Sequence, residues 1–167
     1  MSPTFNHPKR TRKILFVCLG NICRSPAAEG IMKHIVETNG MSHAIEVDSA
    51  GLGPWHVGEL PDKRMRAHGQ RHGYDFNSRA RLFHPDDFDR FDLIIPMDDE
   101  NASTLRSMAR SPYDLKKIVL MATFLRHHPM HHTVPDPYYG TDHSFELVIQ
   151  LLEDACQGLY QDMMEKR

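Results

Sequence analysis

The stretch of sequence that decides the fold runs from Ile14 to Pro26 and has the letters ILFVCLGNICRSP. Its first four residues, Ile14–Val17, form an apolar run typical of a strand that is buried on both faces. From Pro26 onward the apolar period becomes helical, with Ser25 and Pro26 as N-cap and first helical residue and Asn39–Gly40 as the stop. The apolar stripe of this helix consists of Ala28, Ile31, Met32, Ile35 and Val36.

Strands and helices keep alternating along the rest of the chain. The pattern predicts strands at Ile45–Val47, Asp92–Ile95 and Lys117–Met121, and helices opening near Pro61–Asp62, spanning about Asp98–Arg110 and closing the chain from Phe145 to Met163. Such alternation is typical of right-handed βαβ units. We therefore expect a single-domain α/β three-layer sandwich, with a four-stranded parallel sheet flanked by helices, over residues 13–167. Residues 1–12 are expected to form a flexible N-terminal tail.

The composition is that of an ordinary globular protein. The chain has 167 residues, 40% hydrophobic and 25% charged, which excludes disordered, collagen-like and disulfide-rich classes. Its formal net charge of −2 gives no global field that would attract nucleic acid or an anionic membrane. The odd count of three cysteines favours a reducing compartment. Because the apolar run Ile14–Leu19 is too short for a signal peptide or a membrane span, we expect a cytoplasmic protein without nucleic-acid or membrane partners.

The loop between the first strand and the first helix has the residue types of an anion site. A helix N-terminus behind a tight loop lets successive backbone N–H groups converge on one point. Gly20 and Asn21 tolerate the left-handed conformation that such a loop requires, and Arg24 can offer a bidentate fork to phosphate oxygens. Cys18 lies at the mouth of this positive field, which favours its thiolate form, and Ser25 can donate a hydrogen bond to it. A thiolate beneath a bound phosphate is a nucleophile for phosphoryl transfer.

The three cysteines also have simpler interpretations. Cys18 as a buried packing residue would be ordinary, but that interpretation leaves Gly20, Asn21 and Arg24 unexplained. Cys23 within the loop is expected to pack, and Cys156 lies on the apolar stripe of the last helix, where it fills the core.

Two signatures far apart in the chain resemble the low-molecular-weight protein tyrosine phosphatase family. Val17–Pro26 matches the family's Val-Cys-x-Gly-Asn-x-Cys-Arg-Ser-Pro loop at every fixed position, and Asp136–Gly140 matches its Asp-Pro-Tyr-Tyr-Gly segment. The resemblance extends through Asp48–Gly51 and Pro96–Asp98. It implies a parallel sheet in the order 2-1-3-4 and hydrolysis of phosphotyrosine and small aryl phosphates through a phosphocysteine intermediate, without a cofactor or metal.

The resemblance also implies roles for the residues that match. Cys18 is then the nucleophile and Arg24 binds the phosphate, within a phosphate-binding loop formed by Leu19, Gly20, Asn21, Ile22, Cys23 and Ser25. Asp136, in the rigid stretch Val134–Pro137, is the general acid of the first step and the base of the second. In the family, the residue matching Cys23 can form a reversible disulfide with the nucleophile.

Aromatic and polar residues complete the predicted site. Trp55, Tyr138 and Tyr139 are expected to wall a slot for a phenyl ring, deep enough to favour phosphotyrosine over phosphoserine. Ser49 and Asp98 are expected to support Asn21 and the loop from behind. Relatives use a histidine in this support, but the matching segment here, residues 77–81 (NSRAR), has a serine in its place, which puts that bond in doubt.

The sequence also bears on binding partners and on metal binding. The expected partners are a phosphotyrosine-bearing protein and inorganic phosphate or other oxyanions in the loop, with the chain a monomer or weak dimer. The histidines between His127 and His132 invite a metal hypothesis, but Pro129 breaks any helical pairing and a solvated loop is favoured.

Two alternatives to a phosphatase stay open. An arsenate reductase of the same fold would need relay cysteines in mid-chain, and there is none between Cys23 and Cys156. A non-catalytic phosphate-binding module would be expected to have lost the nucleophile, the arginine or the acid, yet Cys18, Arg24 and Asp136 are all present.

Overall fold

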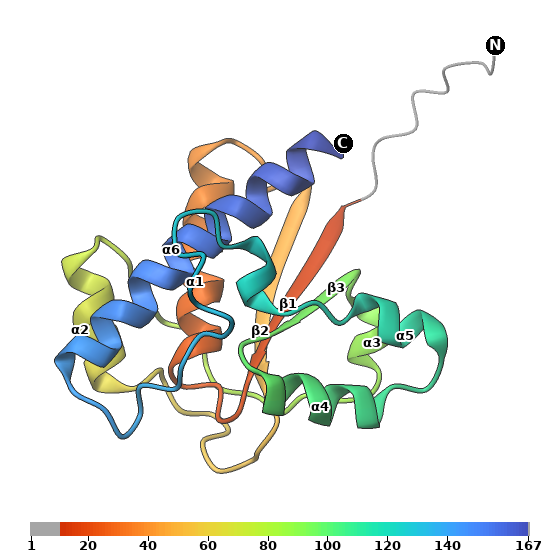
Figure 1. Ribbon diagram of the computed structural model, residues 1–167, viewed down its shortest axis with the longest axis horizontal. Coiled ribbons are helices and arrows are strands. Elements are labelled where there is room, and N and C mark those ends of the chain that lie inside the picture. Colours follow the sequence, from red (N-terminus) through yellow and green to blue (C-terminus); the bar gives the residue numbers. More distant parts are fainter. Residues whose placement is uncertain (1–10, 167) are drawn as a thin grey trace.

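The computed structural model describes residues 11–166 (Figure 1). Most of the predicted N-terminal tail, residues 1–10, lies outside the described residues, and Arg12 already belongs to the first strand. The elements in chain order are β1 (Arg12–Cys18), α1 (Arg24–Thr38), β2 (Ile45–Gly51), α2 (Lys63–Arg71), α3 (Asp87–Arg90), β3 (Leu93–Pro96), α4 (Asp99–Met108), α5 (Pro112–Lys117), the 3₁₀ turn η1 (Met121–Phe124) and α6 (Asp142–Glu165).

The sheet is parallel and has β1 at its centre. Its order is β2-β1-β3, with Cys18 opposite Gly51 on one side and Val17 opposite Pro96 on the other. The carboxyl ends of the three strands therefore meet at one edge, which is where ligands bind in open parallel sheets.

The prediction of a fourth strand at Lys117–Met121 is wrong. Lys117 ends α5 and Met121 begins η1, so only a short extended link remains between them. This link makes a single parallel bridge, Ile94 with Ile118, and Val119 N–H donates to Ile94 O at 3.0 Å. The link thus lies in the predicted fourth position, but a proline-initiated helix occupies the residues that would extend it into a strand.

Helices cover both faces of the sheet. Figure 1 shows α1, α2 and α6 on one side and α3, α4 and α5 on the other. Side chains alternate along β1, so Ile14 and Phe16 pack under α1 and α6 while Leu15 and Val17 join a second core beneath α3 and α4. This two-sided burial is why residues 14–18 of β1 form an unbroken apolar run. Within residues 11–166, no helix is both long and apolar enough to cross a bilayer.

Two of the predicted helix starts, near Asp62 and Asp98, are confirmed, and the predicted N-cap of α1 is wrong. Asp62 caps α2 by accepting from Arg64 N–H, and Asp98 caps α4 by accepting from Asn101 N–H. Ser25, however, is not the N-cap of α1, because the helix begins at Arg24 and its cap residue is Cys23. The Ser25 hydroxyl instead contacts the side chains of Cys18 and Asn21 within the loop. The short helices α3 and α5 were not predicted.

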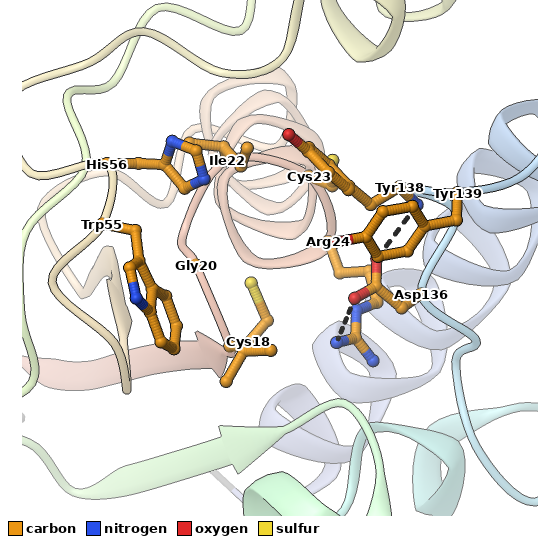
Figure 2. Close-up of a pocket in the computed structure, with 11 residues that line it drawn as sticks. Cys18, Gly20, Ile22, Cys23, Arg24, Trp55, His56, Asp136, Tyr138 and Tyr139 are labelled. Atoms are coloured by element: carbon orange, nitrogen blue, oxygen red, sulfur yellow. Dashed lines mark hydrogen bonds and ion pairs between the residues drawn. The ribbon is translucent and has the colours of Figure 1, made fainter.

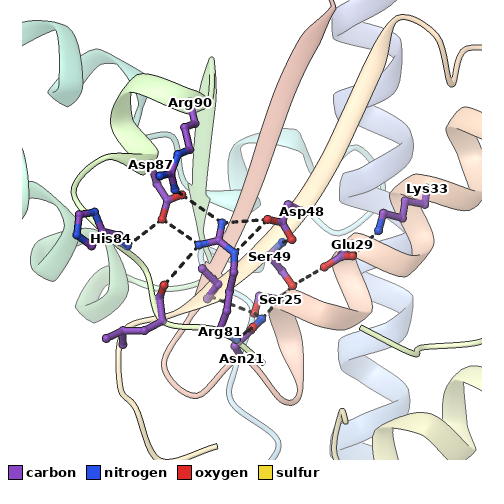
Figure 3. A network of polar contacts seen from close by, with 12 residues as sticks. Asn21, Ser25, Glu29, Lys33, Asp48, Ser49, Arg81, His84, Asp87 and Arg90 are labelled. Atoms are coloured by element: carbon purple, nitrogen blue, oxygen red, sulfur yellow. Dashed lines mark hydrogen bonds and ion pairs between the residues drawn. The ribbon is translucent and has the colours of Figure 1, made fainter. Parts of the chain in front are cut away.

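An ionic cluster around the buried Asp87 ties the segment after Ala80 to the sheet (Figure 3). The Asp87 side chain is fully buried, accepts from Arg81 Nη1 at 3.1 Å and Nη2 at 3.2 Å, and accepts from His84 N–H at 2.8 Å. Arg81 also pairs with Asp48 of β2 at 2.9 Å. The backbone of Arg81 is thereby fixed beside the carboxyl end of β2.

Because Asp87 holds this cluster together, Asp87→Asn is expected to lower the free energy of unfolding by about 3 kcal/mol, the usual cost of breaking a buried ion pair. Urea unfolding followed by circular dichroism measures the change. Asp86→Asn, which alters an exposed neighbour, is the matched control and should stay close to wild type. A loss for Asp87→Asn no larger than that of the control would contradict the role of the cluster.

Candidate active site

The loop between β1 and α1 is folded so that its carbonyls face outward. Leu52 N–H donates to the carbonyls of Cys18 and Leu19, Gly53 N–H donates to Leu19, and Asp62 N–H donates to Ile22. Within the described part of the chain, none of the N–H groups of residues 19–23 donates to a protein acceptor. Five main-chain donors are therefore free for a ligand, beside the N-terminus of α1.

Asn21 gives the loop its turn. Its φ is 57°, the one positive φ among the described non-glycine residues. Its Nδ2 donates to Ser25 Oγ at 2.7 Å and to Ser49 Oγ at 2.9 Å, as expected for Ser49. Its Oδ1 accepts from the main-chain N–H of Arg81 at 3.0 Å, so a backbone donor holds the amide oxygen. Gly51 lies tightly against this turn, because a Cβ there would stand 3.0 Å from Asn21 Cβ.

Arg24 lies under the loop, almost fully buried. Its Nη1 donates to Asp98 Oδ2 at 2.6 Å and to Val134 O at 3.0 Å, and its Nη2 lies 3.6 Å from Asp136 Oδ2. Burial disfavours the charge, but Cys18, Asp98 and Asp136 outweigh it, so the pKa of the Arg24 guanidinium is raised above its ordinary value. Asp98 thus joins the site by orienting the arginine while it caps α4.

Asp136 faces the loop from the far side of the cleft. Its Oδ1 accepts from Tyr138 N–H at 3.1 Å, and its side chain is 41% exposed. Arg64 of α2 steadies the same segment by donating to Tyr138 O at 3.0 Å, and its guanidinium lies 4.6 Å from the Phe145 ring centre. Arg64 was not predicted, since nothing in the sequence shows that α2 packs beside the Asp136 segment.

These residues enclose one cavity of about 360 Å³. Figure 2 shows the Cys18 sulfur pointing into it, with Trp55 and His56 on one side and Asp136, Tyr138 and Tyr139 on the other. All the predicted pocket and catalytic residues line it, whereas Asn21, Ser25 and Ser49 do not, and Asp98 lines a neighbouring cavity that shares Arg24 and Asp136. The complete lining is Cys18, Leu19, Gly20, Ile22, Cys23, Arg24, Trp55, His56, Asp136, Tyr138 and Tyr139.

His56 is the lining residue that sequence reasoning missed. Its Nδ1 pairs with Glu59 Oε2 at 2.7 Å, and its ring lies tilted relative to that of Tyr138, with 6.3 Å between ring centres. Its neighbour Trp55 was recognisable as the one tryptophan, but twelve histidines give no signal that separates this one.

The other two cysteines differ from Cys18 in their surroundings. Burial raises the pKa of the Cys23 thiol, and the nearby charge of Asp62 raises it further. Burial likewise raises the pKa of Cys156 within the core. Both side chains are therefore thiols at neutral pH. Cys18 Sγ lies 3.0 Å from Ser25 Oγ at the loop between β1 and α1.

The histidine-rich loop has a structural partner. His128 Nδ1 pairs with Asp154 Oδ2 at 2.7 Å, and Asp154 also accepts from the N–H groups of Arg126 and His127. Asp154 therefore fixes the start of this loop to α6. Among residues 11–166 there is no group of three or more His, Cys, Asp or Glu side chains arranged to hold a metal ion.

Comparison with known proteins agrees with this geometry. Residues 13–167 match the family described as low molecular weight phosphotyrosine protein phosphatase. A low molecular weight protein-tyrosine-phosphatase of Streptomyces coelicolor is 39% identical over 93% of this chain and 96% of its own. The crystal structure of a protein tyrosine phosphatase from Entamoeba histolytica superposes with a TM-score of 0.90 at 41% identity, over 93% of this chain and 99% of its own.

A second solved structure, a Drosophila arginine phosphatase, has a TM-score of 0.83 at 34% identity, over 90% of this chain and 97% of its own. The chain belongs to the low molecular weight phosphotyrosine protein phosphatase family, and is a phosphatase. The family predicted from the two signatures is thus confirmed.

The contrast between the cysteines predicts selective modification. Iodoacetamide at pH 7 is expected to alkylate Cys18 alone, because the raised pKa of Cys23 and Cys156 keeps them protonated and unreactive. Peptide mass spectrometry identifies the modified residue, and inorganic phosphate should slow the reaction by occupying the loop. Modification of Cys23 before Cys18 would contradict this assignment.

Proposed function

We propose that the protein hydrolyses phosphotyrosine in proteins, with Cys18 as nucleophile, Arg24 as phosphate ligand and Asp136 as general acid and base. The observation that carries the proposal is the set of five unpaired N–H groups in the loop that directly follows Cys18, together with the buried guanidinium of Arg24. A phosphate dianion fits such donors, and the sulfur beneath them is in line to attack phosphorus.

In the first step, the Cys18 thiolate attacks phosphorus and the bond from phosphorus to the phenolic oxygen breaks. Asp136 gives its proton to the leaving oxygen, so that a neutral phenol departs. The Tyr138 N–H bond to Asp136 Oδ1 at 3.1 Å leaves the other carboxyl oxygen toward Arg24 and the cleft. Arg24 and the loop N–H groups stabilise the charge on the transferring phosphoryl group.

In the second step, Asp136 takes a proton from water, and the water oxygen attacks the phosphocysteine. The bond from phosphorus to sulfur breaks, which releases inorganic phosphate and returns Cys18 to the thiolate. Ser25 Oγ, 3.0 Å from the sulfur, can donate a hydrogen bond to this leaving thiolate.

The walls of the cavity support an aryl substrate. Ile22, Trp55 and Tyr138 present apolar surface, and Trp55 rests directly on Gly53, where a side chain would collide with the indole. Asp136 is the single carboxylate in the lining. A phenyl ring fits such walls better than a phosphoarginine guanidinium, which would need further acidic partners.

Other parts of the proposal concern the setting of the enzyme. Three free cysteines within the described chain suit a reducing compartment and support a cytoplasmic location. The expected state is a monomer or weak dimer that also binds inorganic phosphate or other oxyanions in the loop. An arsenate-reductase relay would need a further cysteine outside the loop that can reach Cys18. Cys23 belongs to the loop itself and Cys156 lies in the core, so neither meets that need.

The proposed substrate is tested with three matched peptides that carry phosphotyrosine, phosphoserine or phosphoarginine at one position. Wild type should hydrolyse the phosphotyrosine peptide with a kcat/KM at least about tenfold above the other two, since one lost apolar fit costs about 1–3 kcal/mol. Cys18→Ser should abolish turnover of all three while it still binds phosphate by calorimetry. A preference for phosphoarginine would overturn the substrate, and residual turnover by Cys18→Ser would overturn the nucleophile.

The role of Asp136 is tested by leaving-group dependence. Asp136→Ala should lower kcat/KM for phenyl phosphate, which reports the first step alone, by about 100-fold, because phenolate is a poor leaving group without a proton donor. With a nitrophenyl phosphate, whose leaving group departs unprotonated, the loss should be much smaller. Equal losses on the two substrates in steady-state assays would remove the proton-donor role and leave Asp136 as a partner of Arg24.

A further inference from the structure

A chain of hydrogen bonds leads from the surface of α1 to Cys18. Figure 3 shows its course from Lys33 to Ser25. Its outer end is Lys33, whose Nζ lies 2.5 Å from Glu29 Oε2. The Glu29 side chain is 5% exposed, although it belongs to a helix with ample solvent-facing positions. The other carboxyl oxygen, Oε1, accepts from Ser49 Oγ at 2.6 Å. Neither Glu29 nor Lys33 has a part in the mechanism above.

The carboxylate fixes which way this chain of bonds points. A carboxylate can only accept, so the Ser49 hydroxyl hydrogen is committed to Glu29. Ser49 Oγ is then an acceptor toward Asn21, 2.9 Å away, which requires the amide nitrogen of Asn21 on that side. The Arg81 N–H imposes the same orientation from the opposite side, since it requires Asn21 Oδ1.

The direction carries through to the sulfur. The second hydrogen of Asn21 Nδ2 goes to Ser25 Oγ at 2.7 Å, so Ser25 accepts there and keeps its own hydrogen for another partner. That partner is Cys18 Sγ at 3.0 Å, or the more distant carbonyl of Ala50 at 3.5 Å. A hydroxyl that donates to sulfur stabilises the thiolate.

We propose that Glu29 and Lys33 are positioning residues for the nucleophile. The buried Glu29 carboxylate, neutralised by Lys33, sets the donor direction of the relay through Ser49, Asn21 and Ser25, so that the relay ends with a hydrogen bond donated to Cys18. This inference rests on the proposed role of Cys18 as the nucleophile. It adds a support that reaches from the loop to the exposed face of α1.

Glu29→Gln should disturb the donor direction of the relay, while the substituted side chain keeps its size. Lys33 retains the amide oxygen of the new side chain, so the amide NH₂ turns toward Ser49 and the Ser49 hydroxyl loses its acceptor. The Asn21 amide then faces conflicting partners. We expect kcat for an aryl phosphate, and the rate of Cys18 alkylation by iodoacetamide at pH 6, to fall about 10- to 100-fold, the equivalent of one hydrogen bond to a charged group.

The double variant Glu29→Gln/Lys33→Met distinguishes direction from mere packing. Without Lys33, the glutamine oxygen is free to turn toward Ser49 and accept again, which restores the original direction. Activity and alkylation rate should therefore recover by at least about tenfold relative to the single variant. A purely structural ion pair predicts no recovery, because the Lys33 side chain is 49% exposed and its removal relieves no buried, unpaired charge.

Glu37→Gln is the matched control, since Glu37 is exposed two turns along α1 and has no part in the relay. It should match wild type in both assays. Wild-type rates for Glu29→Gln, or a double variant no faster than the single one, would overturn the proposal.

Should Glu29→Gln fail to fold, Ser49→Ala interrupts the relay without touching the ion pair. It should slow alkylation of Cys18 to the same extent, and wild-type alkylation would overturn the relay. Alkylation needs no phosphate ester, so it judges the relay even if wild type proves inactive on aryl phosphates. That inactivity would count against the proposed function alone.

Discussion

The cleft depends on one residue held in a left-handed backbone conformation, Asn21. This conformation costs a residue with a side chain about 1–2 kcal/mol, and it is what turns the loop carbonyls outward and leaves the N–H groups of residues 19–23 free. Three hydrogen bonds to the Asn21 side chain, each worth about 1 kcal/mol, offset the cost. The backbone strain and the hydrogen bonds that offset it thus belong to the same residue. An alanine at this position would keep the strained backbone but lose the three hydrogen bonds.

Those three hydrogen bonds come from three different parts of the fold: Ser25 in α1, Ser49 in β2, and the backbone of Arg81 in the segment before α3. The Arg81 backbone is in turn fixed by the pairs of its side chain with Asp48 and Asp87. The loop is therefore shaped by α1, by β2 and by the segment that lies beside β2, before any ligand arrives. Donors that are already in place need no reorganisation when charge develops on the phosphoryl group, which is the chief source of electrostatic catalysis.

The parts of this site that follow from local sequence could be predicted, and those that follow from packing could not. A buried strand, a change of period and the residue types between them were enough to place Cys18 and Arg24 at one loop. The donor to Asn21 Oδ1 lies sixty residues further along the chain, and a main-chain N–H has no residue type that marks it. His56 and Arg64 belong to the site only because of how their segments pack. The fourth strand failed for a local reason, since α5 ends at Lys117 and η1 begins at Met121, which leaves only a short extended link between them.

The charges around the cleft explain how it can bind a dianion without a basic surface. The Arg24 guanidinium pairs with Asp98 at 2.6 Å and lies 3.6 Å from Asp136, so the side chains around the cleft supply no excess of positive charge. The attraction must therefore come from main-chain N–H groups and the N-terminus of α1, whose partial charges act only at short range. Such a site recognises the tetrahedral shape of a phosphate group, and it offers little to an extended polyanion. A chain with a net charge of −2 can then be selective for phosphate esters, because the selectivity lies in the geometry of its backbone.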